Sequence, residues 1–225
     1  MKLTAKVETT KLVALNTFET TFYIPHPEFN FKTGQYVTIT LPNLKDLEVR
    51  EQFRDFSVAS SPDKLPYLSI VFRRSDSAFK KDLLGLPKGS EVVIEGPAGI
   101  FTLPEDFRRQ LVFIAGGVGI APFHSIIGLI SENKLPYTLT LIYCNKSPEN
   151  SAYLAELEEI SEKNPLITLI EVFGPLEEKH ITQLSHLNQI WYIAGPSGMV
   201  KTAREILIKL GIMDIDIKTE EFTGY

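Results

Sequence analysis

The sequence has little cysteine, little histidine and no surplus of basic residues, and each shortage excludes a class of protein. With one cysteine, Cys144, the chain can form no intramolecular disulfide and no cysteine-rich metal or iron-sulfur site. The 4 histidines have no Cys, Asp or Glu at ligand spacing, so we expect no metal site. A net charge of -5 provides no basic stripe for a phosphate backbone, which argues against a dedicated nucleic-acid binder.

Long apolar segments are also missing. No apolar run approaches the roughly 20 residues that a membrane helix needs. The first residues, MKLTAKVETTKLVALNTFETT, contain no apolar core of signal-peptide length. We therefore expect a cytoplasmic protein without a membrane span.

What the sequence does contain is two halves with different patterns. Residues 1–104 are a succession of short β-branched and aromatic runs, such as GQYVTITLP and YLSIVFRR, which predicts an all-β barrel or sandwich. In residues 105–225, apolar strands alternate with longer amphipathic stretches, which predicts βαβ units on a mostly parallel sheet. A length of 225 residues suffices for two domains that each bury a core.

One helix of the second half is expected to begin near Pro148. Ser147 is a good N-cap residue type, and proline suits the first helical position. Leu154, Leu157 and Ile160 then recur on one face. In the first half, a helix of ordinary length is needed only around SAFKKDLLGL, residues 77–86.

The strongest local motif is FIAGGVGIAPF, residues 113–123. An apolar strand runs into Gly116, Gly117 and Gly119, and Pro122 follows where a helix should begin. Such glycines let the backbone turn sharply and approach a pyrophosphate, while the helix N-terminus offers unpaired N–H groups. The alternative is a tight strand-to-helix turn without a ligand.

A second motif is RDFSVASSP, residues 54–62. An arginine, an aromatic ring and serine hydroxyls on one strand can pair with phosphate, lie against a flat ligand and donate a hydrogen bond. Taken alone, this motif is better interpreted as a half-buried strand with an exposed arginine.

Together the two motifs resemble those of the ferredoxin-NADP reductase superfamily of flavoproteins, and the resemblance extends over essentially the whole chain. It includes GQYV, EGPAG, AGPSGM and EEF, at residues 34–37, 95–99, 194–199 and 220–222. The resemblance implies an antiparallel β-barrel that binds FAD in residues 1–104, followed by an α/β domain with a parallel sheet that binds NAD(P) in residues 105–225.

The resemblance also implies which residues hold FAD. Arg54 would bind the flavin pyrophosphate, Phe56 would lie against the flavin, and Ser57 would form a hydrogen bond near flavin N5. The full implied set is Arg54, Asp55, Phe56, Ser57, Ile70, Val71, Phe72, Ala78, Phe79 and Lys80. Relatives usually have Tyr at the position of Phe56, and Ser or Thr at that of Lys80. Lys80 is either a charged phosphate contact or an exposed lysine at a helix start.

The second domain would hold NADH or NADPH. The implied nucleotide-binding residues are Gly116, Gly117, Val118, Gly119, Pro122, Asn145, Lys146, Gly195, Pro196 and Met199. Many relatives have Cys where this chain has Ala194. Because the strand end at Asn145 and Lys146 has no acid, the sequence favours NADPH. Lys146 is also interpretable as a solvated loop residue, so both nucleotides stay open.

The last seven residues, TEEFTGY, carry the remaining candidates. By resemblance, Glu220 and Ser57 are polar neighbours of the reacting flavin atoms. An aromatic ring near the end covers the flavin face in relatives, and the register matches Phe222. Tyr225 is an extension that either replaces this ring, covers the adenine or is free. Ser57, Glu220, Phe222 and Tyr225 are the candidate catalytic residues.

These features predict an FAD-dependent oxidoreductase that passes electrons between NAD(P)H and a one-electron carrier, ferredoxin or flavodoxin first among them. The chain has no cysteines for a cluster of its own, so the acceptor is expected to be another protein or a small molecule. Three alternatives stay open: a reductase that releases its flavin, an electron-transfer subunit of a larger complex, and a nucleotide-binding protein without enzymatic activity.

Overall fold

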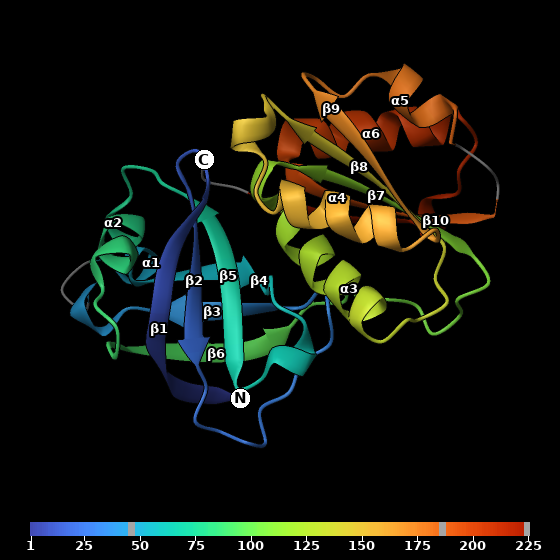
Figure 1. Ribbon diagram of the computed structural model, residues 1–225. Helices are drawn as coiled ribbons and strands as arrows, with labels where there is room; N and C mark the ends of the chain where they lie inside the picture. Colours follow the sequence, from blue (N-terminus) through green and yellow to red (C-terminus); the bar gives the residue numbers. More distant parts are fainter. Residues whose placement is uncertain (45–47, 185–187, 223–225) are drawn as a thin grey trace.

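The computed structural model describes residues 1–44, 48–184 and 188–222 and contains two sheets (Figure 1). An antiparallel sheet of 6 strands is built from the first part of the chain, and a parallel sheet of 5 strands from the second. The predicted fold class is confirmed. The division near residue 104, in the segment between β6 and β7, stays a prediction.

The first sheet closes on itself. Its strands are β1 (Lys2–Ala14), β2 (Thr17–Tyr23), β3 (Tyr36–Thr40), β4 (Phe53–Ser57), β5 (Tyr67–Arg73) and β6 (Glu91–Ala98). Their order is β4-β3-β6-β1-β2-β5, and an antiparallel bridge between Val58 and Ile70 joins the two end strands. Alternate residues such as Leu3, Ala5 and Val7 point into the interior, as expected of strands with one buried face.

The second sheet has the order β11-β10-β7-β8-β9. Its strands are β7 (Gln110–Gly116), β8 (Leu139–Asn145), β9 (Ile167–Phe173), β10 (Gln189–Pro196) and β11 (Ile217–Phe222). The chain proceeds from β7 through β8 to β9, and then returns to the other side of β7 for β10 and β11. The strand order therefore reverses between β7 and β10, and ligands bind outside the carboxyl ends of parallel strands at such a point.

Helices cover both faces of the parallel sheet. The six α-helices of the described residues are α1 (Val49–Gln52), α2 (Ala78–Gly85), α3 (Ile120–Glu132), α4 (Leu154–Lys163), α5 (Glu178–Thr182) and α6 (Ser197–Lys209). Side chains of α3 and α4 pack in one core with Phe113 and Tyr143, and those of α5 and α6 in a second core with Trp191. The sheet is thus buried on both faces, which explains its nearly continuous apolar strands.

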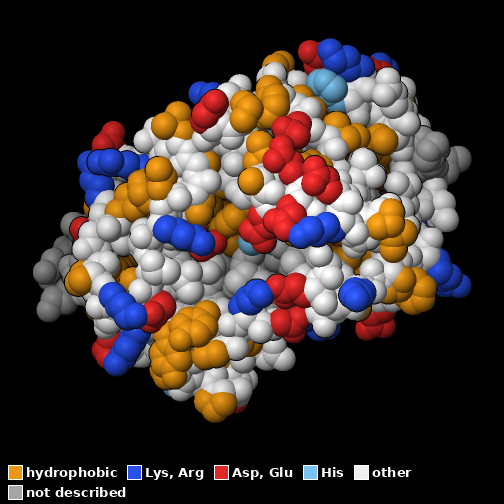
Figure 2. Space-filling view, in the orientation of Figure 1, with side chains coloured by type: hydrophobic (Ala, Val, Ile, Leu, Met, Phe, Trp, Pro, Cys, Tyr) orange, Lys and Arg blue, Asp and Glu red, His pale blue; other side chains and the backbone are white. Residues whose placement is uncertain are grey.

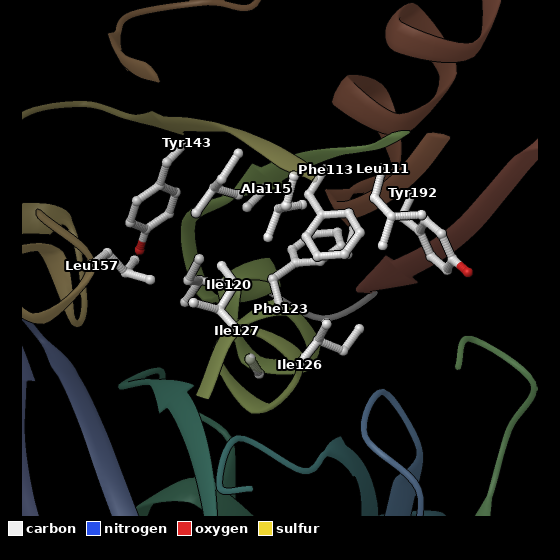
Figure 3. Packing of buried hydrophobic residues seen from close by; sticks show 14 of the residues in the cluster. Leu111, Phe113, Ala115, Ile120, Phe123, Ile126, Ile127, Tyr143, Leu157 and Tyr192 are labelled. Carbon is white, nitrogen blue, oxygen red and sulfur yellow. The ribbon is translucent and has the colours of Figure 1, made fainter. Parts of the chain in front are cut away.

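The core beneath α3 continues into the barrel. Ala59, Val71 and Phe101 of the first half belong to the same buried cluster as Phe123 and Ile126 of α3. Figure 3 shows α3 side chains interleaved with those of the sheet. Because the two halves share this core, their relative position fixes the groups that face each other between them.

The helix expected near Pro148 begins later. Pro148–Asn150 form a 3₁₀ turn, and α4 starts at Leu154. Tyr153, just before α4, has a φ of 62°, which interrupts a right-handed helix. Its hydroxyl donates to Glu19 Oε2 of the barrel at 2.8 Å, so a contact between the two halves holds this residue in place.

Within the described residues, no helix is long and apolar enough to cross a bilayer. Figure 2 shows acidic side chains gathered on the face over α4. The exposed acids of α4 are Glu156, Glu158, Glu159 and Glu162. This surface is the solvated face of an amphipathic helix.

Candidate active site

Two cavities meet where the barrel faces the carboxyl ends of the parallel strands. One, the barrel cavity, measures about 200 Å³ and is lined by Arg54, Asp55, Phe56, Ser57, Val71, Phe72, Arg73, Ser77, Lys80, Val118 and Phe222. The other, the sheet-edge cavity, measures about 700 Å³ and is lined by Arg73, Gly116, Gly117, Cys144, Asn145, Lys146, Gly174, Pro175, Leu176, Pro196, Gly198, Met199 and Thr202. Arg73 lines both.

The barrel cavity concentrates positive charge. Arg54 of β4, Arg73 of β5 and Lys80 of α2 all line it. Burial lowers the pKa of Lys80, and the charges of Arg54 and Arg73 lower it further. The three cations outnumber Asp55, the one acid that lines this cavity, so the net charge of the cavity favours an anionic ligand. This set of charges fits the pyrophosphate of FAD. Lys80 lies at the cavity wall and not on the open surface.

The aromatic part of the barrel cavity is built from packed rings. The Phe56 ring lies 6.1 Å from that of Phe72 and 5.9 Å from that of Phe79, so its position is fixed by the barrel core. Phe56 and Phe72 also line the cavity, which gives a flat ligand an apolar wall.

Most of the residues implied for FAD meet at this cavity, and three do not. Arg54, Asp55, Phe56, Ser57, Val71, Phe72 and Lys80 line it. Ile70 and Phe79 are fully buried in the barrel core, and Ala78 is exposed at the start of α2. The Arg54 guanidinium lies 5.6 Å from the Phe79 ring centre, so Phe79 touches the site through Arg54.

A hydrogen bond joins the barrel to the last strand of the sheet. Ser57 Oγ at the end of β4 donates to Glu220 Oε1 of β11 at 2.6 Å. Burial raises the pKa of Glu220, and the hydrogen bond from Ser57 opposes the rise. Glu220 Oε2 is buried with no hydrogen-bond partner among the described residues. Ser57 lines the barrel cavity, whereas Glu220 lines a separate cavity with Tyr36 and Lys218, so the hydrogen bond runs between the walls of these two cavities.

The two terminal aromatic residues have different outcomes. Phe222, the last described residue, lines the barrel cavity, as Phe56 does. Tyr225 lies outside the described residues. Of the two candidate rings, the structure thus places Phe222 at the site.

The glycines of residues 116–119 serve different purposes. Gly117 has a φ of 55° and lines the sheet-edge cavity, so here glycine permits the turn. A Cβ on Gly116 would lie 2.6 Å from Met199 Sδ, and one on Gly119 would lie 2.7 Å from Gly195 Cα. Those two glycines let the end of β7 and the turn that follows it approach the end of β10 and the first turn of α6. Val118 lines the barrel cavity.

The sheet-edge cavity contains two unsatisfied donors. Arg73 Nε and Asn145 Nδ2 are buried and have no hydrogen-bond partner among the described residues, and both residues line this cavity. Buried donors normally have partners, so the cavity is suited to a ligand rich in acceptor oxygens. The pyrophosphate and hydroxyl groups of a dinucleotide meet this requirement.

The remaining residues implied for the nucleotide divide in two. Gly116, Gly117, Asn145, Lys146, Pro196 and Met199 line the sheet-edge cavity. Pro122 is buried in the first turn of α3, and Gly195, near the carboxyl end of β10, has a φ of 154° and packs on Gly116. Neither Pro122 nor Gly195 lines the sheet-edge cavity itself.

Sequence reasoning missed several lining residues. Arg73 was hidden because it stands in a tandem pair with Arg74, and only the structure shows which one points inward. Gly174 and Pro175 could have been predicted from the sequence. They directly follow an apolar strand, β9, as the glycines after β7 follow theirs, and they line the same cavity. Cys144 also lines the cavity, and burial raises the pKa of its thiol to about 12, so it carries no charge at neutral pH.

Among residues 1–44, 48–184 and 188–222, no three His, Cys, Asp or Glu side chains are grouped so that they could hold a metal ion.

Comparisons with known proteins agree with this arrangement. Residues 113–205 match the model of the oxidoreductase NAD-binding domain. The reductase component of propane 2-monooxygenase from Rhodococcus jostii is 26% identical over 215 residues, which cover 87% of this chain and 56% of that protein. The chain spans about half the length of the curated relatives that it matches.

Solved structures show the same fold over the whole chain. The Amycolatopsis cytochrome P450 reductase GcoB superposes with a TM-score of 0.87 at 24% identity, covering 100% of this chain and 70% of that one. Ferredoxin-NADP+ reductase from Plasmodium falciparum gives a TM-score of 0.79 at 19% identity, covering 98% of this chain and 96% of that one. These likenesses concern the fold, whereas the match over residues 113–205 concerns the sequence.

Proposed function

We propose, from the premise that this chain belongs to the ferredoxin-NADP reductase superfamily of FAD-dependent oxidoreductases, that it takes electrons from NAD(P)H and passes them through FAD to a one-electron carrier. The observation that supports this most directly is the junction of the two cavities at Arg73, which lines both. Hydride transfer requires the two reacting rings to lie against each other, and cavities that share a wall allow this.

When bound, FAD accepts two electrons as a hydride and releases them singly. The protein's part is binding and positioning. Arg54 and Lys80 would hold the FAD pyrophosphate, and Phe56 would support the flavin ring. Phe222 would cover the same cavity from the sheet side and move aside for the nicotinamide. Ser57 and Glu220 would present a polar pair to the reacting edge of the flavin.

The acceptor is a carrier protein, ferredoxin or flavodoxin in the first place. The relatives' names indicate a second candidate: the R. jostii protein is called a reductase component of a monooxygenase, so this chain would serve as one electron-transfer component of a larger complex. An assay with ferricyanide as the electron acceptor distinguishes a self-sufficient reductase from a component that depends on its complex. A self-sufficient reductase oxidises NAD(P)H with ferricyanide alone, whereas a strictly dependent component shows no activity until its partner is added.

The test of the proposed function is spectroscopic. We expect the purified protein to remain yellow through gel filtration and to bleach on anaerobic titration with NADPH or NADH. Because Lys146 lines the sheet-edge cavity, we expect NADPH to bleach it at the lower concentration. A yellow protein that neither nucleotide bleaches would overturn the proposal. A flavin lost in gel filtration would instead favour a reductase that releases its flavin, and a colourless protein that FAD cannot reconstitute would favour a non-enzymatic nucleotide binder.

Replacing Lys80 is expected to affect FAD binding and apoprotein stability in opposite directions. Lys80→Met removes a cation from the phosphate site, so FAD should bind about 10- to 100-fold more weakly, since a hydrogen bond to a charged group contributes roughly 1.5–3 kcal/mol. The pKa of Lys80 is lowered, which means that its charge is disfavoured in the folded apoprotein. The apoprotein of the variant should therefore melt at a higher temperature at neutral pH.

Lys81 is the matched control. It is exposed, forms an ion pair with Asp76 at 3.0 Å and does not line the barrel cavity. Lys81→Met should leave FAD affinity within about 2-fold and stability within about 0.5 kcal/mol. Equal FAD affinity in the Lys80→Met and Lys81→Met proteins, measured by flavin fluorescence quenching, would show that Lys80 does not contact the phosphate.

A further inference from the structure

Tyr153 ends the loop that leads from the sheet-edge cavity to α4, and its backbone has an unfavourable conformation. Its φ of 62° lies in the left-handed region, where a residue with a bulky side chain is an outlier. Such a conformation persists only where the surrounding contacts impose it, and outliers of this kind gather at functional positions. The contacts of Tyr153 therefore show what the strain serves.

The phenol of Tyr153 is held by a buried acid of the barrel. Its hydroxyl donates to Glu19 Oε2 at 2.8 Å, and Glu19 is only 7% exposed. Lys11, opposite Glu19 in the β1–β2 ladder, pairs with Oε1 at 3.0 Å. A buried carboxylate is costly unless its oxygens have partners, and here each oxygen has one. Burial and the charge of Glu19 hold the pKa of the Tyr153 phenol well above its ordinary value, so the phenol stays a proton donor.

The ring of Tyr153 is fixed from a second direction. It stacks on the imidazole of His124 in α3, with ring centroids 3.8 Å apart and an interplanar angle of 16°. His124 Nδ1 donates to the carbonyl oxygen of Ala59 at 2.7 Å, since a carbonyl oxygen can only accept. Tyr153 thus lies between Glu19 and a ring that is itself hydrogen-bonded to the first half of the chain.

The loop that Tyr153 ends begins at the sheet-edge cavity. Asn145 and Lys146, its first residues, line that cavity. The loop is bonded internally, because Ser151 Oγ donates to the carbonyl oxygen of Ser147 at 3.0 Å. A displacement at Tyr153 is therefore transmitted along the loop to the cavity wall.

Both barrel contacts of this loop come from one element, the hairpin of β1 and β2. Leu15 N, between the two strands, donates to the carbonyl oxygen of Glu149 at 2.7 Å, and Glu19 follows on β2. On its other side β2 pairs with β5, where Thr17 is opposite Arg73. Since Arg73 lines both cavities, the hairpin connects this loop to a strand that forms part of the barrel cavity.

We propose that Tyr153 is a positioning residue for the nicotinamide nucleotide: through Glu19 it fastens residues 145–153 to the barrel and so sets the cavity wall that Asn145 and Lys146 form. The inference rests on the proposed function and deepens it. Tyr153 lines neither the barrel cavity nor the sheet-edge cavity, so its effect on binding comes through the loop. Without the hydroxyl contact Tyr153 can return to a negative φ, which displaces the loop.

The test compares Tyr153→Phe with Tyr137→Phe in the FAD-loaded protein. Tyr137 is the matched control, because its hydroxyl also donates to a carbonyl oxygen before β7, that of Pro104 at 2.6 Å, and it lines neither of the two cavities. Anaerobic stopped-flow reduction at increasing NADPH or NADH gives the dissociation constant and the limiting rate separately. We expect Tyr153→Phe to weaken both nucleotides by about 3- to 30-fold, with the limiting rate within about 2-fold. Tyr137→Phe should change neither quantity by more than about 2-fold.

Variants of Glu19 show whether the barrel contact carries the effect. Glu19→Gln keeps an acceptor oxygen for the Tyr153 hydroxyl and should retain nucleotide affinity within about 3-fold. Glu19→Leu removes the acceptor and should weaken nucleotide binding as Tyr153→Phe does. The double variant of Glu19→Leu and Tyr153→Phe should bind no more weakly than either single variant, because both remove the same contact.

The outcomes separate this inference from the proposed function. If neither nucleotide reduces the flavin of the unaltered protein, the proposed function fails. If the flavin is reduced and Tyr153→Phe binds both nucleotides as tightly as the unaltered protein, the inference alone is overturned. Equal losses of affinity in Tyr153→Phe and Tyr137→Phe, or a lower limiting rate with an unchanged dissociation constant, overturn it as well. Should Tyr153→Phe not fold, Glu19→Leu replaces it, and unchanged nucleotide affinity in that variant contradicts the inference.

Discussion

Gly119→Ala is expected to destabilise the protein by about 3 kcal/mol or more and to abolish binding of the nicotinamide nucleotide. The new Cβ would lie 2.6 Å from the carbonyl carbon of Ala194 and 2.7 Å from Gly195 Cα. Both are backbone atoms near the carboxyl end of β10, and no side-chain rotation can remove the clash. Overpacking of this kind costs roughly 1–3 kcal/mol or more. The turn after β7 and the carboxyl end of β10 would have to separate, which would open the sheet-edge cavity beside them.

Gly128→Ala is the control for this prediction. Gly128 lies in α3, the helix that follows the turn, and a Cβ there would make only an ordinary contact of 3.7 Å with Ser61 Cβ. Alanine is favoured over glycine inside a helix by up to about 1 kcal/mol, so this variant should be slightly more stable. Urea unfolding of both variants measures the difference. Similar stabilities would mean that the carboxyl end of β10 moves to accommodate the added methyl group.

Ser57→Ala is expected to slow the reduction of bound FAD by NAD(P)H on the order of 100-fold. Its hydroxyl donates to Glu220 Oε1 at 2.6 Å, and the removal of a positioned donor from an enclosed site typically costs about 10²–10³ in rate. The variant would leave neither carboxyl oxygen of Glu220 with a hydrogen bond among the described residues, because Oε1 would lose Ser57 and Oε2 already has no partner. Stopped-flow reduction under anaerobic conditions measures the rate.

Ser57→Ala is also expected to change how the stability of the apoprotein depends on pH. The folded-state pKa of Glu220 is raised above its ordinary value of 4.5 by burial, so apoprotein stability falls as the pH rises from 4.5 through the folded-state pKa. Ser57→Ala removes the hydrogen bond that opposes this rise, so the loss should become larger and extend to higher pH. Glu220→Gln should abolish it.

A double-mutant cycle tests whether the two residues act as a pair. We expect the rate effects of Ser57→Ala and Glu220→Gln to be non-additive, with the double variant little slower than Ser57→Ala. Ser57→Thr keeps a hydroxyl and should retain most of the rate. Additive rate effects, together with a pH dependence of unfolding that neither substitution changes, would show that the hydrogen bond has no part in catalysis.

Much of the fold could be predicted from the sequence because it is written in local patterns. The change from short alternating runs to apolar strands followed by amphipathic stretches separates the antiparallel sheet from the parallel one. The sequence predicts a helix start near Pro148, whereas α4 starts at Leu154. Tyr153 adopts a positive φ there, and its hydroxyl bonds to Glu19, 134 residues away in the chain. A local pattern has no information about such a distant partner.

The candidate site was partly predictable for the same reason. Arg54, Phe56, Ser57 and the glycines of residues 116–119 lie in short motifs, and the structure brings them to two adjoining cavities. Arg73 was not predictable, because a tandem pair of arginines at a strand end has the same sequence whichever member faces inward. The role of Gly119 was also hidden, since its neighbours Ala194 and Gly195 come from a strand far along the chain.

The sequence by itself determined the kinds of chemistry available: one cysteine and scattered histidines without a metal cluster, glycines that permit a close turn, and an arginine, a serine and a glutamate for polar contacts. The tertiary structure decided which of these groups act together. It joined Ser57 to Glu220 across 163 residues and set Arg73 over Gly117. The reason is physical: residue type and local spacing set what a side chain can do, whereas its partners depend on how the barrel and the parallel sheet pack around their shared core.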